Sequence, residues 1–112
     1  MPDFESMVSP AYRTFLTETP GQAEAWSVMV DGVAKASALD AKTAALAYLA
    51  VLAAQRLESG LPFHVWLAKQ AGASREEVAS AVLVGLPAAG LCVTHALPAA
   101  LAAYDADSSE SR

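Results

Sequence analysis

The chain has 112 residues, of which 54% are hydrophobic, and its formal net charge is −5. This length corresponds to a single domain. The acidic balance and the lack of a Lys/Arg cluster disfavour nucleic-acid binding, which needs a basic surface for the phosphates. Because small domains bury a small share of their surface, a chain this apolar is expected to form a homo-oligomer.

The cysteine content and the apolar stretches bear on the compartment. Cys92 is the one cysteine, so an intrachain disulfide is excluded and a reducing compartment is indicated. The first residues are acidic without an apolar run, and we therefore expect a cytoplasmic protein without a secretory signal. Residues 78–104 contain no Asp, Glu, Lys or Arg, but Pro87 and Pro98 interrupt them. This stretch is interpreted as two buried helices, with no membrane span expected.

Helix signals dominate the chain, and no sustained alternation typical of strands occurs. We predict an all-α fold: a compact bundle of about six helices over residues 1–104, followed by a flexible polar tail over residues 105–112. The first signal is Ser9 followed by Pro10, a cap and a first-turn proline that together begin a short helix.

The second predicted helix begins with the same device, Thr19 followed by Pro20. Its apolar residues recur at i, i+3, i+4 and i+7, which predicts that one face of the helix points inward. These residues are Trp26, Met29, Val30 and Val33.

The third predicted helix is capped by Asp40 and runs from about Ala41 to Glu58. Between residues 44 and 54 it is apolar on nearly every side, which indicates a central position or an interface. Gly60 is predicted to end it, because glycine readily takes the left-handed conformation.

Three further helices are predicted after this point. Pro62 begins one that Gly72 ends, and Ser74 and Glu77 are spaced as the capping box of the next. The last helix is predicted to end near Tyr104. Apolar residues at helical spacing, which predict the buried face of the helix after Ser74, are Ala79, Val82, Leu83 and Leu86.

Two segments carry a family resemblance. Leu39-Asp40-Ala41-Lys42-Thr43 is similar to a "Leu-Asp-x-Lys/Arg-Thr" motif that opens a long apolar helix, and Ala71-Gly72-Ala73-Ser74-Arg75-Glu76-Glu77-Val78 is similar to "Ala-Gly-Ala-Thr-Arg-Glu-Glu-Ile". Over roughly residues 36–104 the chain thus resembles the carboxymuconolactone decarboxylase and alkylhydroperoxidase D-like family. The resemblance implies a helical homo-oligomer, a trimer or hexamer.

The peroxidase-type members of this family use Glu, eleven residues, Cys-x-x-Cys, three residues, His. When the pattern is aligned on His64, its cysteine positions hold Leu57 and Gly60 and its glutamate position holds Ala45. Without a thiolate nucleophile, this relay is excluded. The decarboxylase-type members also lack the cysteine pair and keep a histidine after the same turn. The resemblance therefore implies an enzyme without a redox cofactor that acts on a small organic acid or lactone.

The turn before the fourth helix holds the candidate site. His64 is the candidate acid or base, because a neutral imidazole can exchange protons near pH 7, and Glu58 could orient it across the turn. Arg56 has a planar fork that suits a carboxylate ligand. Together with Gln55 and Trp66, Arg56 forms the set of candidate substrate-binding residues.

Each of these residues also has a structural interpretation. His64 could be hydrogen-bonded to a backbone carbonyl, and Glu58 and Arg56 could be solvated charges. The chain would then be a non-catalytic ligand-binding or structural member of the same family. A third interpretation is a peroxidase that uses Cys92, with His95 one turn away. Cys92 and His95 are only two possible metal ligands, which do not make a metal site, so no bound metal is expected.

Overall fold

The computed structural model describes residues 4–110, with side chains described to residue 106, and every regular element in this range is helical. This agrees with the predicted all-α fold. Two of the α-helices in the described residues, α1 and α7, are single turns, and the other six are longer. The elements are α1 Phe4–Met7, α2 Pro10–Glu18, α3 Pro20–Ala36, α4 Ala41–Ala54, η1 Glu58–Gly60, α5 Leu61–Gln70, α6 Arg75–Leu83, α7 Leu86–Ala89, η2 Leu91–Ala96 and α8 Leu97–Glu110, where η marks a 3-10 helix.

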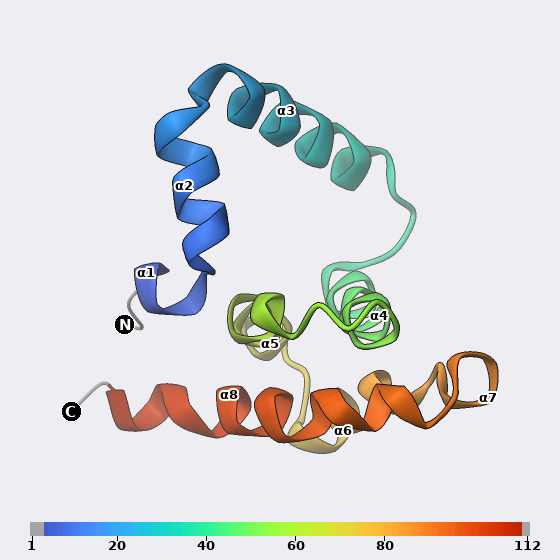
Figure 1. Cartoon of the computed structure of the whole chain (residues 1–112). Coiled ribbons are helices and arrows are strands. Elements are labelled where there is room, and N and C mark those ends of the chain that lie inside the picture. The colour runs from blue at the N-terminus through green and yellow to red at the C-terminus, as the bar shows by residue number, and fades with distance from the viewer. Residues whose placement is uncertain (1–3, 111–112) are drawn as a thin grey trace.

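The core lies between α4, α5, α6, η2 and α8. Figure 1 shows α4 and α5 above α6 and α8, with α2 and α3 forming an arch over them. Each large aliphatic side chain buried here contributes roughly 1.5–3 kcal/mol. The largest fully buried side chains are Leu49, Leu61, Val65, Val78, Val82 and Val93.

The C-terminal half differs in detail from the prediction. Val78 and Val82 are the fully buried residues of α6, whereas Leu83 and Leu86 are partly buried. The charge-free stretch is divided among α6, α7, η2 and α8 rather than two helices, because Gly85 and Gly90 interrupt it. No helix within residues 4–110 is long and apolar enough to cross a membrane.

The last helix, α8, continues to Glu110, beyond its predicted end near Tyr104. One reason is an ion pair: Arg75 donates from Nε and Nη2 to the two carboxylate oxygens of Asp105 at 2.9 and 3.0 Å. Asp105, the first residue of the predicted polar tail, is thus paired with α6. Residues 111 and 112 of that tail lie outside the described residues.

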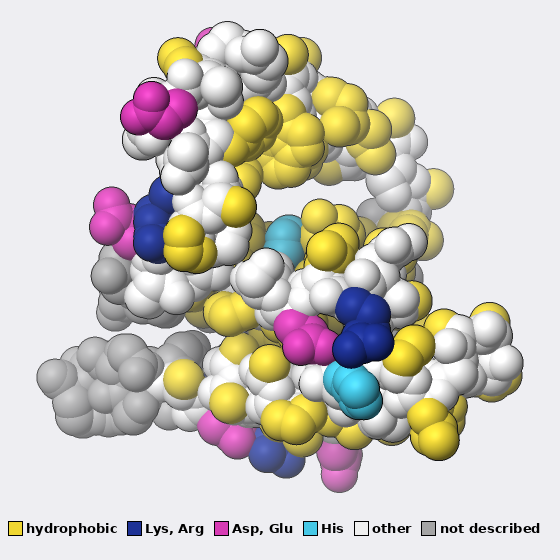
Figure 2. Space-filling model, viewed as in Figure 1, with side chains coloured by type: hydrophobic (Ala, Val, Ile, Leu, Met, Phe, Trp, Pro, Cys, Tyr) yellow, Lys and Arg dark blue, Asp and Glu magenta, His cyan; other side chains and the backbone are white. Residues whose placement is uncertain are grey.

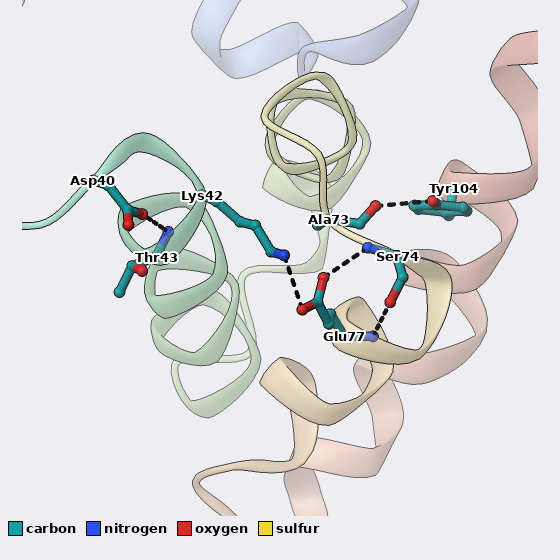
Figure 3. Close-up of polar contacts among 7 residues, drawn as sticks. All are labelled: Asp40, Lys42, Thr43, Ala73, Ser74, Glu77 and Tyr104. Carbon is teal, nitrogen blue, oxygen red and sulfur yellow. Dashed lines mark hydrogen bonds and ion pairs between the residues drawn. The ribbon is translucent and has the colours of Figure 1, made fainter.

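The turn between α5 and α6 joins three helices (Figure 3). The predicted capping box is confirmed: Ser74 Oγ accepts from the Glu77 N–H at 3.0 Å, and Glu77 Oε1 accepts from the Ser74 N–H at 2.9 Å. The other Glu77 oxygen pairs with Lys42 of α4 at 2.9 Å. The hydroxyl of Tyr104, on α8, donates to the Ala73 carbonyl at 2.9 Å. The hydrogen bond from the Ser74 N–H and the contact with Lys42 hold the pKa of Glu77 below its ordinary value.

At the other end of the chain, α2 and α3 form a bent arm. Ser9 caps α2 as predicted, accepting from the Tyr12 N–H at 3.1 Å. Thr19 does not cap α3 through its side chain, because its hydroxyl donates to the Phe15 carbonyl at 2.7 Å instead. Trp26 of α3 packs on the rings of Tyr12 and Phe15 at 5.6 and 6.0 Å and fixes the bend.

The apolar face of α3 that was predicted to point inward is not buried within this chain. Its four residues are between 38% exposed, at Trp26, and 63% exposed, at Val33. The reason is that α3 arches over α4 without packing on it, and Figure 2 shows open space beneath it that side chains do not fill.

The end of α4 also differs from the prediction. Asp40 caps its start, accepting from the Thr43 N–H at 2.7 Å, but the helix ends at Ala54 and not near Glu58. Leu57 N–H bonds to the Leu52 carbonyl at 2.9 Å, and Arg56 N–H to the Ala53 carbonyl at 3.2 Å. This is a Schellman motif, and Arg56, with φ 62°, holds the left-handed position assigned to Gly60.

The left-handed backbone of Arg56 predicts a stabilising substitution. This conformation costs an L-residue about 1–2 kcal/mol, and glycine avoids that cost. Part of the gain is lost again, because glycine gives up more backbone entropy on folding. We expect Arg56→Gly to raise the free energy of unfolding by ~0.5–1 kcal/mol in urea denaturation. Gln55→Gly is the matched control, because the right-handed φ of −85° at Gln55 gives glycine no advantage. Equal destabilisation by both would contradict the strain at Arg56.

Candidate functional site

His64 lies in the first turn of α5, on the side that meets α4. Its neighbours Leu61 and Val65 are fully buried and anchor α5 in the core. The imidazole centroid lies 4.1 Å from the Tyr48 ring of α4 and 5.2 Å from the Phe63 ring. The half-buried imidazole is therefore held between two aromatic rings from two helices.

These surroundings control the charge of the imidazole. Burial lowers the pKa of His64 from 6.5 to about 4. The physical cause is the loss of hydration of the cation, and no carboxylate among the described residues forms an ion pair that would offset it. Near neutral pH the ring is uncharged, with one nitrogen able to accept a proton and the other able to donate a hydrogen bond.

The other candidate residues of the turn lie close in sequence but are not bonded to His64. Glu58 begins η1 and is partly buried, whereas Gln55 and Arg56 are exposed at the end of α4. Within residues 4–110, no hydrogen bond or ion pair joins Glu58 or Arg56 to the imidazole. Their roles in catalysis and substrate binding stay predictions.

Gly60 marks the position where the peroxidase relay would carry a cysteine. A Cβ atom built at Gly60 would lie 3.9 Å from His64 Cδ2 and 3.3 Å from Leu52 Cδ2. A side chain at this position would thus contact the imidazole edge directly. In this protein glycine leaves that place without a side chain, so no thiol stands beside the imidazole.

Tyr48 was not predicted as a site residue. It stands sixteen positions before His64, so no local spacing connects the two residues, and their contact depends on how α4 packs against α5. The available signal was its polar hydroxyl within residues 44–54 of α4, which are otherwise Ala, Leu and Val. At 43% exposure, Tyr48 presents part of its ring to solvent beside the imidazole.

Trp66 lies on the other side of Phe63. The two rings stack with centroids 6.0 Å apart and planes at 28°, and Phe4 of α1 meets Phe63 edge-on at 5.4 Å. The Trp66 Nε1 atom is buried and has no hydrogen-bond partner among the described residues. Ring packing therefore holds Trp66 in place, and its predicted contact with substrate stays a prediction.

Cys92 and His95 lie apart from this site, on η2. The Cys92 thiol is partly buried and donates to the Ala89 carbonyl at 3.3 Å, whereas His95 is exposed. Within the described part of the chain, no three His, Cys, Asp or Glu side chains are grouped so as to hold a metal ion.

A separate open groove of about 690 Å³ lies between α4 and α6. Its polar groups are hydroxyls and two carboxylates, and one of these, Glu77, is already engaged by Ser74 and Lys42. The groove offers no basic group for an anionic substrate, which makes it a weaker candidate than the surroundings of His64. Its lining residues are Thr43, Leu46, Ala47, Ser74, Glu76, Glu77, Ser80, Ala81 and Val84.

Comparison with protein families gave one match, which agrees with the helix order and the capped turn described above. Curated proteins and solved structures gave no match. The sequence model of the carboxymuconolactone decarboxylase family matches residues 20–105, from the start of α3 into α8, and so includes Tyr48, His64 and the turn before α6. The chain belongs to the carboxymuconolactone decarboxylase family.

Proposed function

We propose that the protein is an enzyme without a redox cofactor that acts on a small organic acid or lactone, with His64 as its acid–base residue. The observation that carries the proposal is the half-buried, neutral imidazole between Tyr48 and Phe63. It occupies the position of the histidine in the family pattern, and strongly shifted pKa values are concentrated at functional sites.

A decarboxylation at this site would need little machinery. The bond between the carboxyl carbon and its neighbour breaks, CO₂ leaves, and the electron pair is delocalised into an adjoining enolate. A proton must then reach the carbon that lost CO₂. In this proposal His64 relays the proton as a neutral ring: one nitrogen gives its proton to the carbon while the other takes one from solvent water.

The exposed end of α4 supplies groups for the substrate carboxylate. Arg56 keeps a left-handed backbone that costs about 1–2 kcal/mol, and such strain is concentrated at functional positions. Its guanidinium suits bidentate binding of a carboxylate. In this proposal Gln55 and Trp66 add contacts to the substrate, and Glu58 orients His64 once the substrate is bound.

The role of His64 is tested by turnover of a panel of lactones and unsaturated carboxylic acids. We expect His64→Gln to lower kcat by ~10²–10⁴-fold, the usual contribution of a positioned acid or base, while circular dichroism shows unchanged helix content. The control is His95→Gln, which changes the exposed histidine outside this site. Full activity of His64→Gln on a substrate of the native protein would contradict the assignment.

The burial of His64 also predicts a pH dependence of stability. The unfolded imidazole titrates at 6.5 and the folded one at about 4, so between these values the unfolded chain binds more protons. The free energy of unfolding therefore falls as the pH is lowered from 6.5 toward 4. Since the ring is partly exposed, we expect a total loss of ~1–3 kcal/mol.

Urea unfolding between pH 7 and pH 5 measures most of this effect. Above pH 5 the paired carboxylates of Asp40, Glu77 and Asp105 stay ionised, because their pKa values lie below the ordinary values of 3.8 to 4.5. We expect His64→Gln to flatten the slope and His95→Gln to retain it. An unchanged slope in His64→Gln would show that another group is responsible.

A second candidate function is ligand binding without catalysis. The observations that favour it are Ala45, Leu57 and Gly60 at the relay positions and the absence, among the described residues, of a group that orients the imidazole by a hydrogen bond. Calorimetric titration with small carboxylates separates the two candidates, because this one gives binding without turnover. A peroxidase based on Cys92 has the least support, because its partly buried thiol donates to the Ala89 carbonyl and the chain has no second cysteine.

A further inference from the structure

Tyr48 is a polar side chain placed where the packing of α4 on α5 does not need one. Tyr48 and Leu52 stand one turn apart on α4, and both reach the start of α5, which lies beside α4 in Figure 1. Leu52 packs on Gly60 and is 6% exposed, whereas Tyr48 meets His64 and is 43% exposed. Leucine thus supplies the buried contact between the two helices, and the phenol is kept at its solvent-facing edge.

The hydroxyl of Tyr48 is also unused by the fold. Between residues 4 and 106 it has no hydrogen-bond partner, whereas the hydroxyl of Tyr104 ties α8 to the Ala73 carbonyl at 2.9 Å. If only an aromatic ring were needed against the imidazole, phenylalanine would serve, as it does at Phe63. The Tyr48 hydroxyl is therefore a donor that remains available to a bound molecule.

This donor and the imidazole nitrogens lie within reach of one small ligand. The two ring centroids are 4.1 Å apart with their planes at 53°, so the hydroxyl is no farther from the imidazole centre than this distance plus the length of the phenol. Leu61 and Val65 are fully buried and close the core side of His64. A ligand consequently approaches the imidazole from the outer side, where Tyr48 is exposed.

The decarboxylation proposed above needs a donor that His64 does not supply. As CO₂ leaves, negative charge collects on the enolate oxygen, and a hydrogen-bond donor placed at that oxygen lowers the barrier. With a pKa of about 4, His64 is neutral near pH 7, and its N–H is committed to the carbon that lost CO₂. Of the two side chains whose rings contact the imidazole, Tyr48 and Phe63, only Tyr48 carries a donor.

We infer that Tyr48 is a second catalytic residue of this site, whose hydroxyl donates a hydrogen bond to the substrate oxygen that becomes the enolate oxygen. No bond is made or broken at Tyr48, because the proton stays on the phenol. The electron pair of the broken carbon–carbon bond returns from the enolate to form the carbon–hydrogen bond when His64 delivers its proton. The inference rests on the proposed function and assigns the stabilisation of charge to a different residue from the proton transfer.

Tyr48→Phe tests the hydroxyl alone, because it keeps the ring. On the panel of lactones and unsaturated carboxylic acids we expect kcat to fall ~10²–10³-fold, the usual effect of removing one such donor. The change in KM should be smaller, since the hydrogen bond strengthens as charge develops. The matched control is Tyr12→Phe, which removes the hydroxyl of a tyrosine that packs on Phe15 and Trp26 and should keep the native kcat.

NMR titration of the two histidines separates the loss of the hydroxyl from a displaced ring. Tyr48→Phe should leave the pKa of His64 at its native value, because the ring still shields the imidazole from water. Tyr48→Ala should raise that pKa toward 6.5, while the exposed His95 serves as the internal reference. If Tyr48→Phe lowered kcat and also shifted the pKa of His64, the tyrosine would act through packing, which would overturn the inference.

The failure of this inference differs from the failure of the proposed function. Turnover that is lost in His64→Gln but retained in Tyr48→Phe would refute the role of Tyr48 and leave the enzyme in place. A native protein that turns over no member of the panel would refute the enzyme, and a catalytic Tyr48 with it. Turnover that depends on both residues, with the pKa of His64 unchanged in Tyr48→Phe, is the expected result.

Discussion

The hydrogen-bonded turn between α5 and α6 is the constraint on which the rest of the fold depends. Glu77 satisfies the start of α6 and also reaches Lys42 on α4, while the Ala73 carbonyl accepts from Tyr104 on α8. Each exposed bond contributes little alone, but the turn fixes the relative rotation of three helices. That rotation brings Val78 into the core against α4 and leaves the opposite face of α4 for the site.

The position of His64 follows from burial rather than from polar contacts. Leu61 and Val65 enter the core, and His64, in the same helical turn, is drawn against the Tyr48 ring of α4. The imidazole consequently loses hydration without gaining a partner among the described residues, which is why its pKa falls. The same packing that stabilises the fold thus prepares a neutral histidine.

The sequence predicted the parts of the fold that depend on local chemistry. The caps at Ser9, Asp40 and Ser74 were correct because each depends on residues within a single helical turn. The end of α4 was wrong because a glycine further on gave a stronger signal than an arginine that takes the left-handed conformation. Tyr48 was missed since its contact with His64 depends on tertiary packing, for which a single sequence carries no spacing rule.

The exposed face of α3 shows how an accurate helical pattern can predict burial that one chain does not provide. The pattern requires an apolar partner but does not say to which molecule that partner belongs.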